Sequence, residues 1–569
     1  MNTNQIRDTA IYNFAIGLNY FGKKLAATKE AVFCLVCEEF ASLALPEEDI
    51  LSIIEDEHEN TKTEKAKAKN TAAKRKKVSD IDNRPVSAGA LSHSENSRSV
   101  LAGKKFIVTS CQNNTDIHQE FLRNLEAYAN HLKAELIIFP FTYNLNGFQN
   151  GVTDSEEIYY DGAVKPYLQS ASVWLGESLK VAAMNFNILP TVKNPLSGMK
   201  EAIGTAQALI IPHATIAHEN IAVLGAQFGA IVPSLYSTGC LSQMNYIQKQ
   251  AGHKAENRHN FGALIVEYND QDQFWVRQIE TDYTGVFYDL GSLVQNGEIE
   301  FTTNTVEVLN YGDIHAEKID EKHANFLWCD GGFLDTLRPR YQMMHDLCDF
   351  SSMNHHNREN HYHRAKNQAN KESVQNDMMQ VCEILDSSKR DFCKTIIVRS
   401  NHDTALDSWL VDNKYEPRKD AVNASFYYSM QVMAYACIEK GTFFDSLPHA
   451  LNLASFCTDY TNSDFKFLKA SESFKIKGVE LGEHGHSGTN GSRGSPKQFS
   501  SNKMTTGHTH SPSIYNGCYT AGVTGKLAMG YNETGASSWV QAHVIQYVNG
   551  FRAIIAVKDN GAGNLASWA

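Results

Sequence analysis

The chain has 569 residues, 42% of them hydrophobic and 20% charged, and its formal net charge is −12 at pH 7. This length exceeds what one hydrophobic core serves, so we expect two or three domains. The negative charge argues against a uniformly basic nucleic-acid-binding surface, and the lack of any apolar run of about 18 residues argues against a membrane-spanning helix. The N-terminus shows no secretory signal, and 11 cysteines without framework spacing are typical of reduced thiols, so we expect a cytoplasmic protein.

Residues 1–60 are predicted to be helical, because apolar residues recur three and four positions apart at 10–21 and 31–45. Cys34 and Cys37 have CxxC spacing, but they lie in an apolar helical stretch without a partner pair, which favours core packing over zinc or redox chemistry. Residues 61–102 begin with a run of eight basic residues and one glutamate and are predicted to be a flexible linker. The basic run is explained equally well as a soluble tether and as a contact for nucleic-acid phosphates.

Residues 103–300 are predicted to form an α/β accessory domain. A strand at 104–111, an amphipathic helix at 118–132 and a second strand at 134–141 make a βαβ unit, and further apolar strands follow. The segment has no GxGxxG fingerprint and no phosphate-binding lysine loop, so nothing in it predicts nucleotide binding.

Potential metal ligands gather in residues 305–569, where 14 of the 22 histidines lie at or beyond residue 315. They follow short apolar strands or lie in glycine-containing loops. In chain order they are Asp313 and His315, Asp346 and Asp349, Asn401 with His402 and Asp403, His484 and His486, and His508 and His510.

This mixture of side chains suits a site for two divalent ions. Two ions about 3.5–4 Å apart need a bridging carboxylate, further oxygen and imidazole ligands, and open positions for water and substrate. Mixed Asp, His and Asn ligands suit Mn²⁺, Fe or Zn²⁺ rather than Ca²⁺, and the absence of thiolates disfavours a closed structural zinc site. Strand ends place such side chains along one rim of an α/β sheet.

The same segments resemble the ordered blocks of the calcineurin-like metallophosphoesterases, DxH, GDxxD, GNH[DE], a His-Gly block and GHxH. This chain has GDIH, HDLCD, SNHD, EHGH and GHTH in the same order. The resemblance covers residues 305–569 and says nothing about the first 300. It implies a β-sandwich flanked by helices, in a four-layer α/β/β/α arrangement, and hydrolysis of phosphoesters.

The resemblance also implies a role for each matched residue. Asp346 would bridge two divalent ions, with Mn²⁺ foremost and Mg²⁺, Fe or Zn²⁺ as alternatives. His402 would face the scissile phosphate and either protonate the leaving oxygen or stabilise the charge that builds on the phosphoryl group. The remaining ligands would be Asp313, His315 and His510 for the first ion, and Asn401, His484 and His508 for the second.

Some positions depart from the family pattern or leave a choice. His345 and Ser400 stand where the second and third blocks usually have glycine. Asp330 is an alternative bridging ligand, although the strand before Asp346 favours the latter. His486 is an alternative to His484, which is favoured because it precedes the glycine.

Other positions bear on the substrate. Protein phosphatases of this family carry an arginine after the second block and a glutamate at the end of the third, where this chain has Phe350 and Asp403. This difference counts against a phosphoprotein phosphatase. Nucleases, nucleotide phosphodiesterases and small-molecule phosphatases remain.

DNA is the predicted substrate. A histidine-rich and basic insert at 354–371 follows the bridging block, a glycine-rich loop near 490 adds further donors, and the basic run near residue 70 adds a non-specific attraction. The candidate phosphate contacts are His355, His356, Arg358 and Arg493. The alternatives are a nucleotide or small-molecule phosphoesterase, and a scaffold with a vestigial metal site.

The whole chain also resembles phage-encoded metallophosphoesterases implicated in degrading host DNA early in infection. This resemblance implies action in the bacterial cytoplasm. We expect no membrane partner. Self-association and a protein partner stay open.

Overall fold

The chain divides into two compact units, Met1–Arg84 and Pro85–Ala569. The computed structural model describes most of the second unit, namely β1 (Val86–Ser87) and residues 99–143, 158–183, 192–354, 360–370, 372–455, 458–461, 465–488, 503–530 and 532–558; of the first it describes Pro46, Ile50, Ser52 and Ile53. The helices predicted for residues 1–60, the Cys34 and Cys37 pair and the basic run therefore lie outside the described residues, apart from these four. Within the predicted linker, β1 and β2 (Ser99–Leu101) are strands.

The predicted βαβ unit is confirmed. β3 (Lys105–Gln112) and β4 (Glu135–Phe141) pair in parallel and are joined by α4 (Gln119–Leu132). The antiparallel strands β12 (Phe261–Tyr268) and β13 (Phe274–Thr281) complete a four-stranded sheet in the order β13-β12-β3-β4. Every residue of β12 and β13 is buried, as expected for strands covered on both faces.

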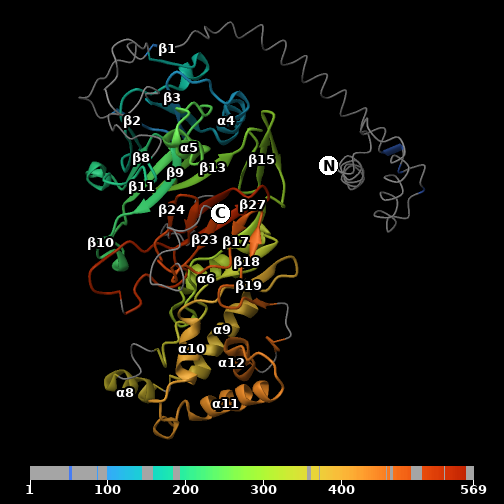
Figure 1. The fold of residues 1–569 in the computed structure, drawn as a ribbon. Helices are drawn as coiled ribbons and strands as arrows, with labels where there is room; N and C mark the ends of the chain where they lie inside the picture. The colour runs from blue at the N-terminus through green and yellow to red at the C-terminus, as the bar shows by residue number, and fades with distance from the viewer. Residues whose placement is uncertain are drawn as a thin grey trace. The chain divides into compact units, whose positions relative to one another are not determined.

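A second sheet of 11 strands runs from the middle of the chain into its C-terminal part (Figure 1). The crossing point is the pairing of β9 with β24, through His218 and Ile514. In order across the sheet the strands are β2, β6 (Val173–Leu175), β7 (Leu179–Val181), β8 (Ala208–Ile211), β11 (Ser234–Gly239), β9 (His213–Asn220), β24 (Ser513–Tyr515), β25 (Cys518–Thr520), β23 (Met504–Thr506), β22 (Val479–Glu480) and β21 (Lys475–Ile476). Residues 103–300 and 305–569 thus share a sheet within one compact unit, and the boundary drawn between them stays a prediction.

A third sheet of six strands carries the first three predicted blocks. Its order is β20 (Lys466–Phe467), β19 (Lys394–Ile397), β18 (Tyr341–Met344), β17 (Val306–Asn310), β27 (Ala542–Tyr547) and β28 (Arg552–Ala556). β17, β18, β19 and β20 are parallel, whereas β27 and β28 are antiparallel to their neighbours. The carboxyl ends of β17, β18 and β19 therefore meet at one edge of the sheet.

Alternate residues of these strands enter two different cores. Leu309, Met344 and Ile397 belong to a core shared with the helices, and Val308, Met343 and Ile396 pack against Val479 and Leu481 around β22. Helices thus cover one face of the six-stranded sheet and the 11-stranded sheet covers the other, which confirms a mixed α/β fold.

Figure 1 shows α9 to α12 gathered on one side of these strands. The helices of this part are α6 (Glu321–Trp328), α7 (Phe333–Leu337), α8 (His361–Asn370), α9 (Val374–Ser388), α10 (Asp403–Leu410), α11 (Ala424–Glu439) and α12 (Ser446–Ala454). No helix in the described part of the chain is long and apolar enough to cross a bilayer.

Smaller elements complete the fold. A three-stranded antiparallel sheet of β14 (Phe287–Asp289), β15 (Ser292–Gln295) and β16 (Glu298–Phe301) packs beside α4. The short pairs are β1 with β5 (Tyr159–Tyr160) and β10 (Val223–Leu224) with β26 (Ala536–Ser537), and α5 (Gln250–Glu256) precedes β12.

Candidate metal centre

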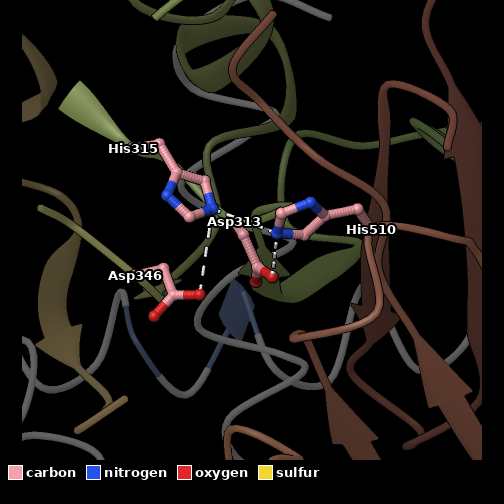
Figure 2. A group of neighbouring side chains, drawn as sticks. All are labelled: Asp313, His315, Asp346 and His510. Carbon is pink, nitrogen blue, oxygen red and sulfur yellow. Dashed lines mark hydrogen bonds and ion pairs between the residues drawn. The ribbon is translucent and has the colours of Figure 1, made fainter. Parts of the chain in front are cut away.

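Four predicted ligands form a compact buried group in Figure 2: Asp313, His315, Asp346 and His510, whose ligand atoms all lie within 4.8 Å of one another. Asp313 and His315 follow β17, Asp346 follows β18, and His510 follows β23. The imidazole rings of His315 and His510 point toward each other, and their Nε2 atoms are 3.0 Å apart. His510 Nε2 is 3.1 Å from Asp313 Oδ2, and His315 Nε2 is 3.8 Å from Asp346 Oδ2.

Other predicted ligands lie around His484. Nε2 of His484 is 3.2 Å from Asp346 Oδ2 and 3.1 Å from Asn401 Oδ1. The ring of His508 lies 5.2 Å from that of His484. Asp346 therefore stands between two groups of donors, the position that the resemblance implies for a bridging carboxylate.

Both histidines of the fourth block lie in this region. His484 contacts Asp346 and Asn401, and the ring of His486 lies 5.4 Å from that of His484, so the choice of His484 as the ligand stays a prediction. Asp330 is exposed in the turn after α6, so it is not part of the buried group that contains Asp346.

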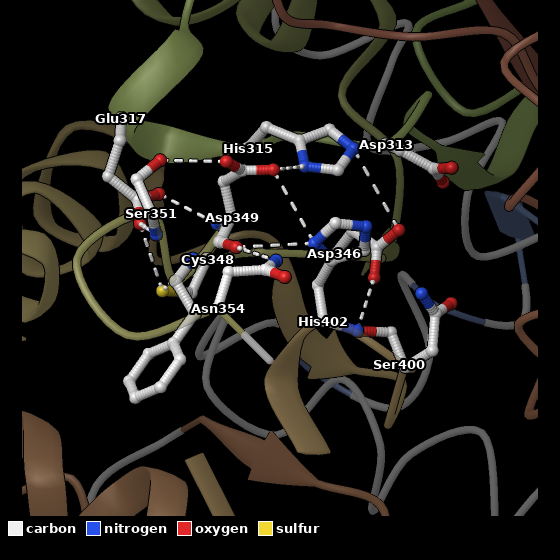
Figure 3. Close-up of polar contacts among 12 residues, drawn as sticks. Asp313, His315, Glu317, Asp346, Cys348, Asp349, Ser351, Asn354, Ser400 and His402 are labelled. Carbon is white, nitrogen blue, oxygen red and sulfur yellow. Dashed lines mark hydrogen bonds and ion pairs between the residues drawn. The ribbon is translucent and has the colours of Figure 1, made fainter. Parts of the chain in front are cut away.

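His402 lies beside the carboxylates and is held by Asp349 (Figure 3). The main-chain N–H of His402 donates to Asp346 Oδ1 at 3.4 Å, and Nδ1 of the ring is 3.4 Å from Asp349 Oδ1. The same Asp349 oxygen is 3.3 Å from His315 Nδ1. Asp349 thus connects His402 to the ligand group.

Two carboxylates of this network, Asp349 and Glu317, had no role predicted from the sequence. Glu317 is half-buried and accepts hydrogen bonds from the main-chain N–H groups of Asp349 at 2.7 Å and Ser351 at 3.2 Å. Burial, followed by the charge of Asp349, raises the pKa of Glu317. The sequence signal that could have identified Glu317 is its position two residues after His315, in the segment DIHAE.

The charge of the centre is strongly negative, as the neighbouring imidazoles show. Burial by itself lowers the pKa of His315, but Asp349, Asp346 and Asp313 outweigh it and raise this pKa to about 9. His484 behaves alike: burial lowers its pKa, and Asp346 and Asp313 together raise it to about 9. The cluster therefore favours positive charge in its centre.

The donor set fits divalent metal ions. Carboxylate oxygens, an amide oxygen and imidazole nitrogens converge without thiolates, as intermediate or hard cations require. Asp313 Oδ1 and His510 Nδ1 are buried and have no hydrogen-bond partner among the described residues. Buried carboxylates need a compensating cation or proton, and a metal ion supplies one.

The backbone is constrained at the ligands. His315, Asp346, His508 and His510 have φ values of 50°, 44°, 73° and 55°. Such left-handed conformations cost non-glycine residues roughly 1–3 kcal/mol each and concentrate at functional sites. Gly507 is required by close approach, because a Cβ there would lie 2.1 Å from Asp313 Oδ1.

His345 and Ser400, which stand where the family usually has glycine, contact residues next to the proposed ligands. His345 Nε2 is 3.0 Å from Asn310 Oδ1, and burial, followed by the charge of His484, lowers the pKa of His345 to about 4. The hydroxyl of Ser400 donates to Asp403 Oδ2 at 2.8 Å. Burial, followed by the charge of Asp346, raises the pKa of Asp403 to about 6.

The predicted phosphate contacts His355, His356, Arg358 and Arg493 lie outside the described residues. The helix that follows the first three, α8, docks beside the centre. Nε2 of His363 is 3.0 Å from the carbonyl oxygen of Ser351, and Nδ2 of Asn367 donates to the carbonyl of Ser352 at 3.0 Å.

Comparison with known proteins finds a phage relative. The chain is 43% identical over 562 residues to protein A1 of Escherichia phage T5, and the match spans 97% of this chain and 98% of that protein. No family model and no solved structure matches the chain.

Proposed function

This chain belongs to the family of protein A1 of Escherichia phage T5, and on that premise we propose that it is a phage enzyme that hydrolyses the phosphodiester bonds of DNA with two divalent metal ions. The observation that carries the proposal is the buried cluster of aspartates and histidines at the ends of parallel strands. The residues of that cluster come from separate segments, in the order of the calcineurin-like blocks. We further propose that the enzyme acts in the cytoplasm of the bacterial host.

The layers of the C-terminal part support the calcineurin-like assignment. The six-stranded sheet has helices on one face and a second sheet on the other. This arrangement supplies three of the four layers of an α/β/β/α sandwich. Its strands β17, β18 and β19 deliver Asp313, Asp346 and Asn401 to one edge.

We assign each matched side chain a part in the reaction. Asp313, His315 and His510 would hold one ion and Asn401, His484 and His508 the other, and Asp346 contacts both groups of side chains. Divalent ions held there, Mn²⁺ foremost, would supply Lewis-acid polarisation of the phosphoryl oxygens and a lower pKa for a nucleophilic water.

His402 is assigned as the proton donor to the leaving oxygen. Asp349 holds its Nδ1, which orients the ring, so we assign proton transfer to Nε2. The same aspartate is close to His315, and the orientation of His402 is therefore tied to the ligand group.

An aromatic ring next to the centre supports a nucleic-acid substrate. Trp539 is half-buried, and its ring lies 4.1 Å from that of His510. Tryptophan faces are platforms on which nucleic-acid bases stack. The histidine-rich and basic insert supports the same substrate through the phosphate contacts predicted for it from the sequence.

The first test is hydrolysis of bis-para-nitrophenyl phosphate by the purified chain with Mn²⁺, Mg²⁺, Zn²⁺ or Ni²⁺. We expect turnover with at least Mn²⁺ and none with Asp346→Asn. No turnover by the unaltered chain with any of these ions would reject the enzyme and favour a scaffold with a vestigial metal site.

The second test identifies the substrate. Linear, circular and single-stranded DNA are incubated with the protein and Mn²⁺ beside a panel of nucleotides. We expect cleavage of DNA. Hydrolysis of nucleotides without cleavage of any DNA would replace the proposal with a nucleotide phosphodiesterase.

A further inference from the structure

A cavity of about 450 Å³ lies between the middle of the chain and its C-terminal strands. Its walls come from β9, α5 and the segment after it, β13, the β24–β25 hairpin, and the β27–β28 turn with the start of β28. None of the proposed metal ligands lines it. Lys503, at one end of β23, borders the cavity, whereas His508 follows the other end of this strand. The cavity is therefore separate from the candidate metal centre.

Positive charge predominates in this cavity. Lys254, Arg258, Lys503 and Arg552 line it together with a single carboxylate, Glu280. We call it the cationic cavity. Within the described part of the chain, Lys254, Lys503 and Arg552 form no ion pair with a carboxylate within 4.0 Å.

Arg552 is a buried cation held by neutral groups. It is 3% exposed, and its guanidinium donates to the main-chain carbonyls of Met504 at 2.5 Å and Gly517 at 2.9 Å. Glu280 is engaged elsewhere, because it accepts from the Tyr519 hydroxyl at 2.5 Å and from Asn260 Nδ2 at 2.9 Å. Arg552 also lies 4.2 Å from the centre of the Tyr519 ring, and the charge of Glu280 partly offsets the cost of its burial, so the positive charge that the cavity offers to an anion comes chiefly from the lysines.

Aromatic and amide groups line the same space. Phe551 is half-buried, and Lys503 Nζ lies 4.9 Å from the centre of its ring. Asn257 and Asn516 also line the cavity and offer both donors and acceptors. An ammonium group beside an aromatic face is an arrangement suited to a phosphate joined to a stacking base.

We propose that the cationic cavity binds a nucleoside phosphate, either as a free nucleotide or as part of a single strand of nucleic acid. Lys254, Arg258 and Lys503 receive the phosphate, and Phe551 receives the base. The volume lies within the roughly 300–1,000 Å³ of ordinary small-molecule sites. Binding here requires no metal ion, so the proposal does not rest on the hydrolytic function.

The test measures equilibrium binding to the full-length protein in EDTA, which prevents metal-dependent turnover. The probes are deoxyadenosine monophosphate, a ten-nucleotide single-stranded deoxyoligonucleotide and inorganic phosphate. We expect the double variant Lys254→Ala/Lys503→Ala to bind the nucleotide probe at least tenfold more weakly, since two phosphate contacts are removed. Phe551→Leu should weaken nucleotide binding about tenfold and leave phosphate binding unchanged, because stacking on the ring is lost.

A matched control is Lys394→Ala/Lys440→Ala, which removes two exposed lysines that do not line the cavity. We expect it to bind all probes as the unaltered chain does, and thermal melting verifies that each variant is folded. Binding of the mononucleotide identifies a free nucleotide as the source, and binding of the oligonucleotide alone identifies a strand. Absence of binding by both, or equal binding by the cavity variant, would overturn the proposal. Phosphate bound as tightly as the nucleotide would overturn the role of the base.

Discussion

Two buried polar clusters in the molecule differ in how their charges are balanced. In the middle of the chain, the guanidinium of Arg277 contacts both oxygens of Asp289 at 2.7 Å and also binds Glu267, which is 3.0 Å from Lys105. The hydroxyl of Tyr128 donates to the same Asp289 carboxylate at 2.7 Å. Each carboxylate of this cluster has a cationic side chain as its partner.

The candidate metal centre lacks this balance. Asp313, Asp346 and Asp349 are buried, and their ion-pair partners within the described residues are histidines rather than lysine or arginine. An imidazole can serve as a neutral metal ligand, whereas a guanidinium cannot. A charge cluster completed by its own side chains stabilises the fold, whereas a cluster of buried carboxylates without lysine or arginine is suited to bind a cation.

Among the changes at the two clusters, we expect the largest effect from His402→Ala, and it concerns the turnover rate. Loss of a general acid lowers the turnover rate by about 10²–10⁴-fold. The metal content, measured by mass spectrometry on the purified protein, should stay near that of the unaltered chain. As a control, His449→Ala on α12 should retain full turnover. Loss of the metal from His402→Ala would show that this residue is a ligand instead of the proton donor.

The internally balanced cluster should respond to Asp289→Asn by losing stability. Removing one partner leaves Arg277 buried without full compensation, which costs about 3–5 kcal/mol in the free energy of unfolding. Urea unfolding should give the same loss with EDTA and with Mn²⁺. A loss of stability that appeared only with Mn²⁺ would mean that this cluster also depends on a bound metal ion, which would contradict the prediction.

The incomplete cluster should instead respond to metal. At a free Mn²⁺ concentration 100 times the dissociation constant of a site, the free energy of unfolding should rise by about 2.7 kcal/mol for each ion bound. Asp346→Asn should abolish most of this increase, since it removes a ligand. An undiminished Mn²⁺ response in the variant would refute the assignment of Asp346.

The smallest effect concerns a neutral histidine pair, His323 and His543, whose Nε2 atoms are 2.9 Å apart. Burial, opposed in part by Asp320, lowers the pKa of His323 to about 4, and burial followed by His323 lowers the pKa of His543. Both pKa values lie below about 6.5, the ordinary value for histidine. The unfolded chain therefore binds more protons than the folded chain between pH 6.5 and 4. The stability that the pair contributes is thus complete above pH 6.5 and is lost as the pH falls.

The slope that results is about 1.4 kcal/mol per pH unit for each histidine. Urea unfolding in EDTA at pH 7, 6 and 5 measures it as the difference between the unaltered chain and His323→Asn. The variant should show the shallower acid dependence. Equal slopes would mean that His323 does not titrate as its burial requires.

Local patterns predicted the elements that carry the candidate site. Apolar strands ending in polar residues gave β17, β18 and β19, and their parallel pairing brings Asp313, Asp346 and Asn401 to one edge. The roles of these residues as ligands stay predictions. The α/β class was predicted from the alternation of strands and helices in residues 103–300, and from the family resemblance in residues 305–569.

Contacts between distant segments could not be read from local patterns. Asp349 was visible at the end of its strand, but its position between His315 and His402 depends on three separate loops. Glu317 acts through main-chain groups more than 30 positions away. The pairing of His218 with Ile514 joins strands that no periodicity relates.

That last pairing has a practical consequence for anyone dissecting the protein. A fragment beginning at residue 305 would keep every proposed ligand, but β24 would lose its neighbouring strand β9. The side chains of Ile514 and Tyr519, which share a core with Ile216, would become exposed. An uncovered strand edge of this kind invites intermolecular association. The C-terminal half is thus poorly suited to excision or to transplantation onto another carrier.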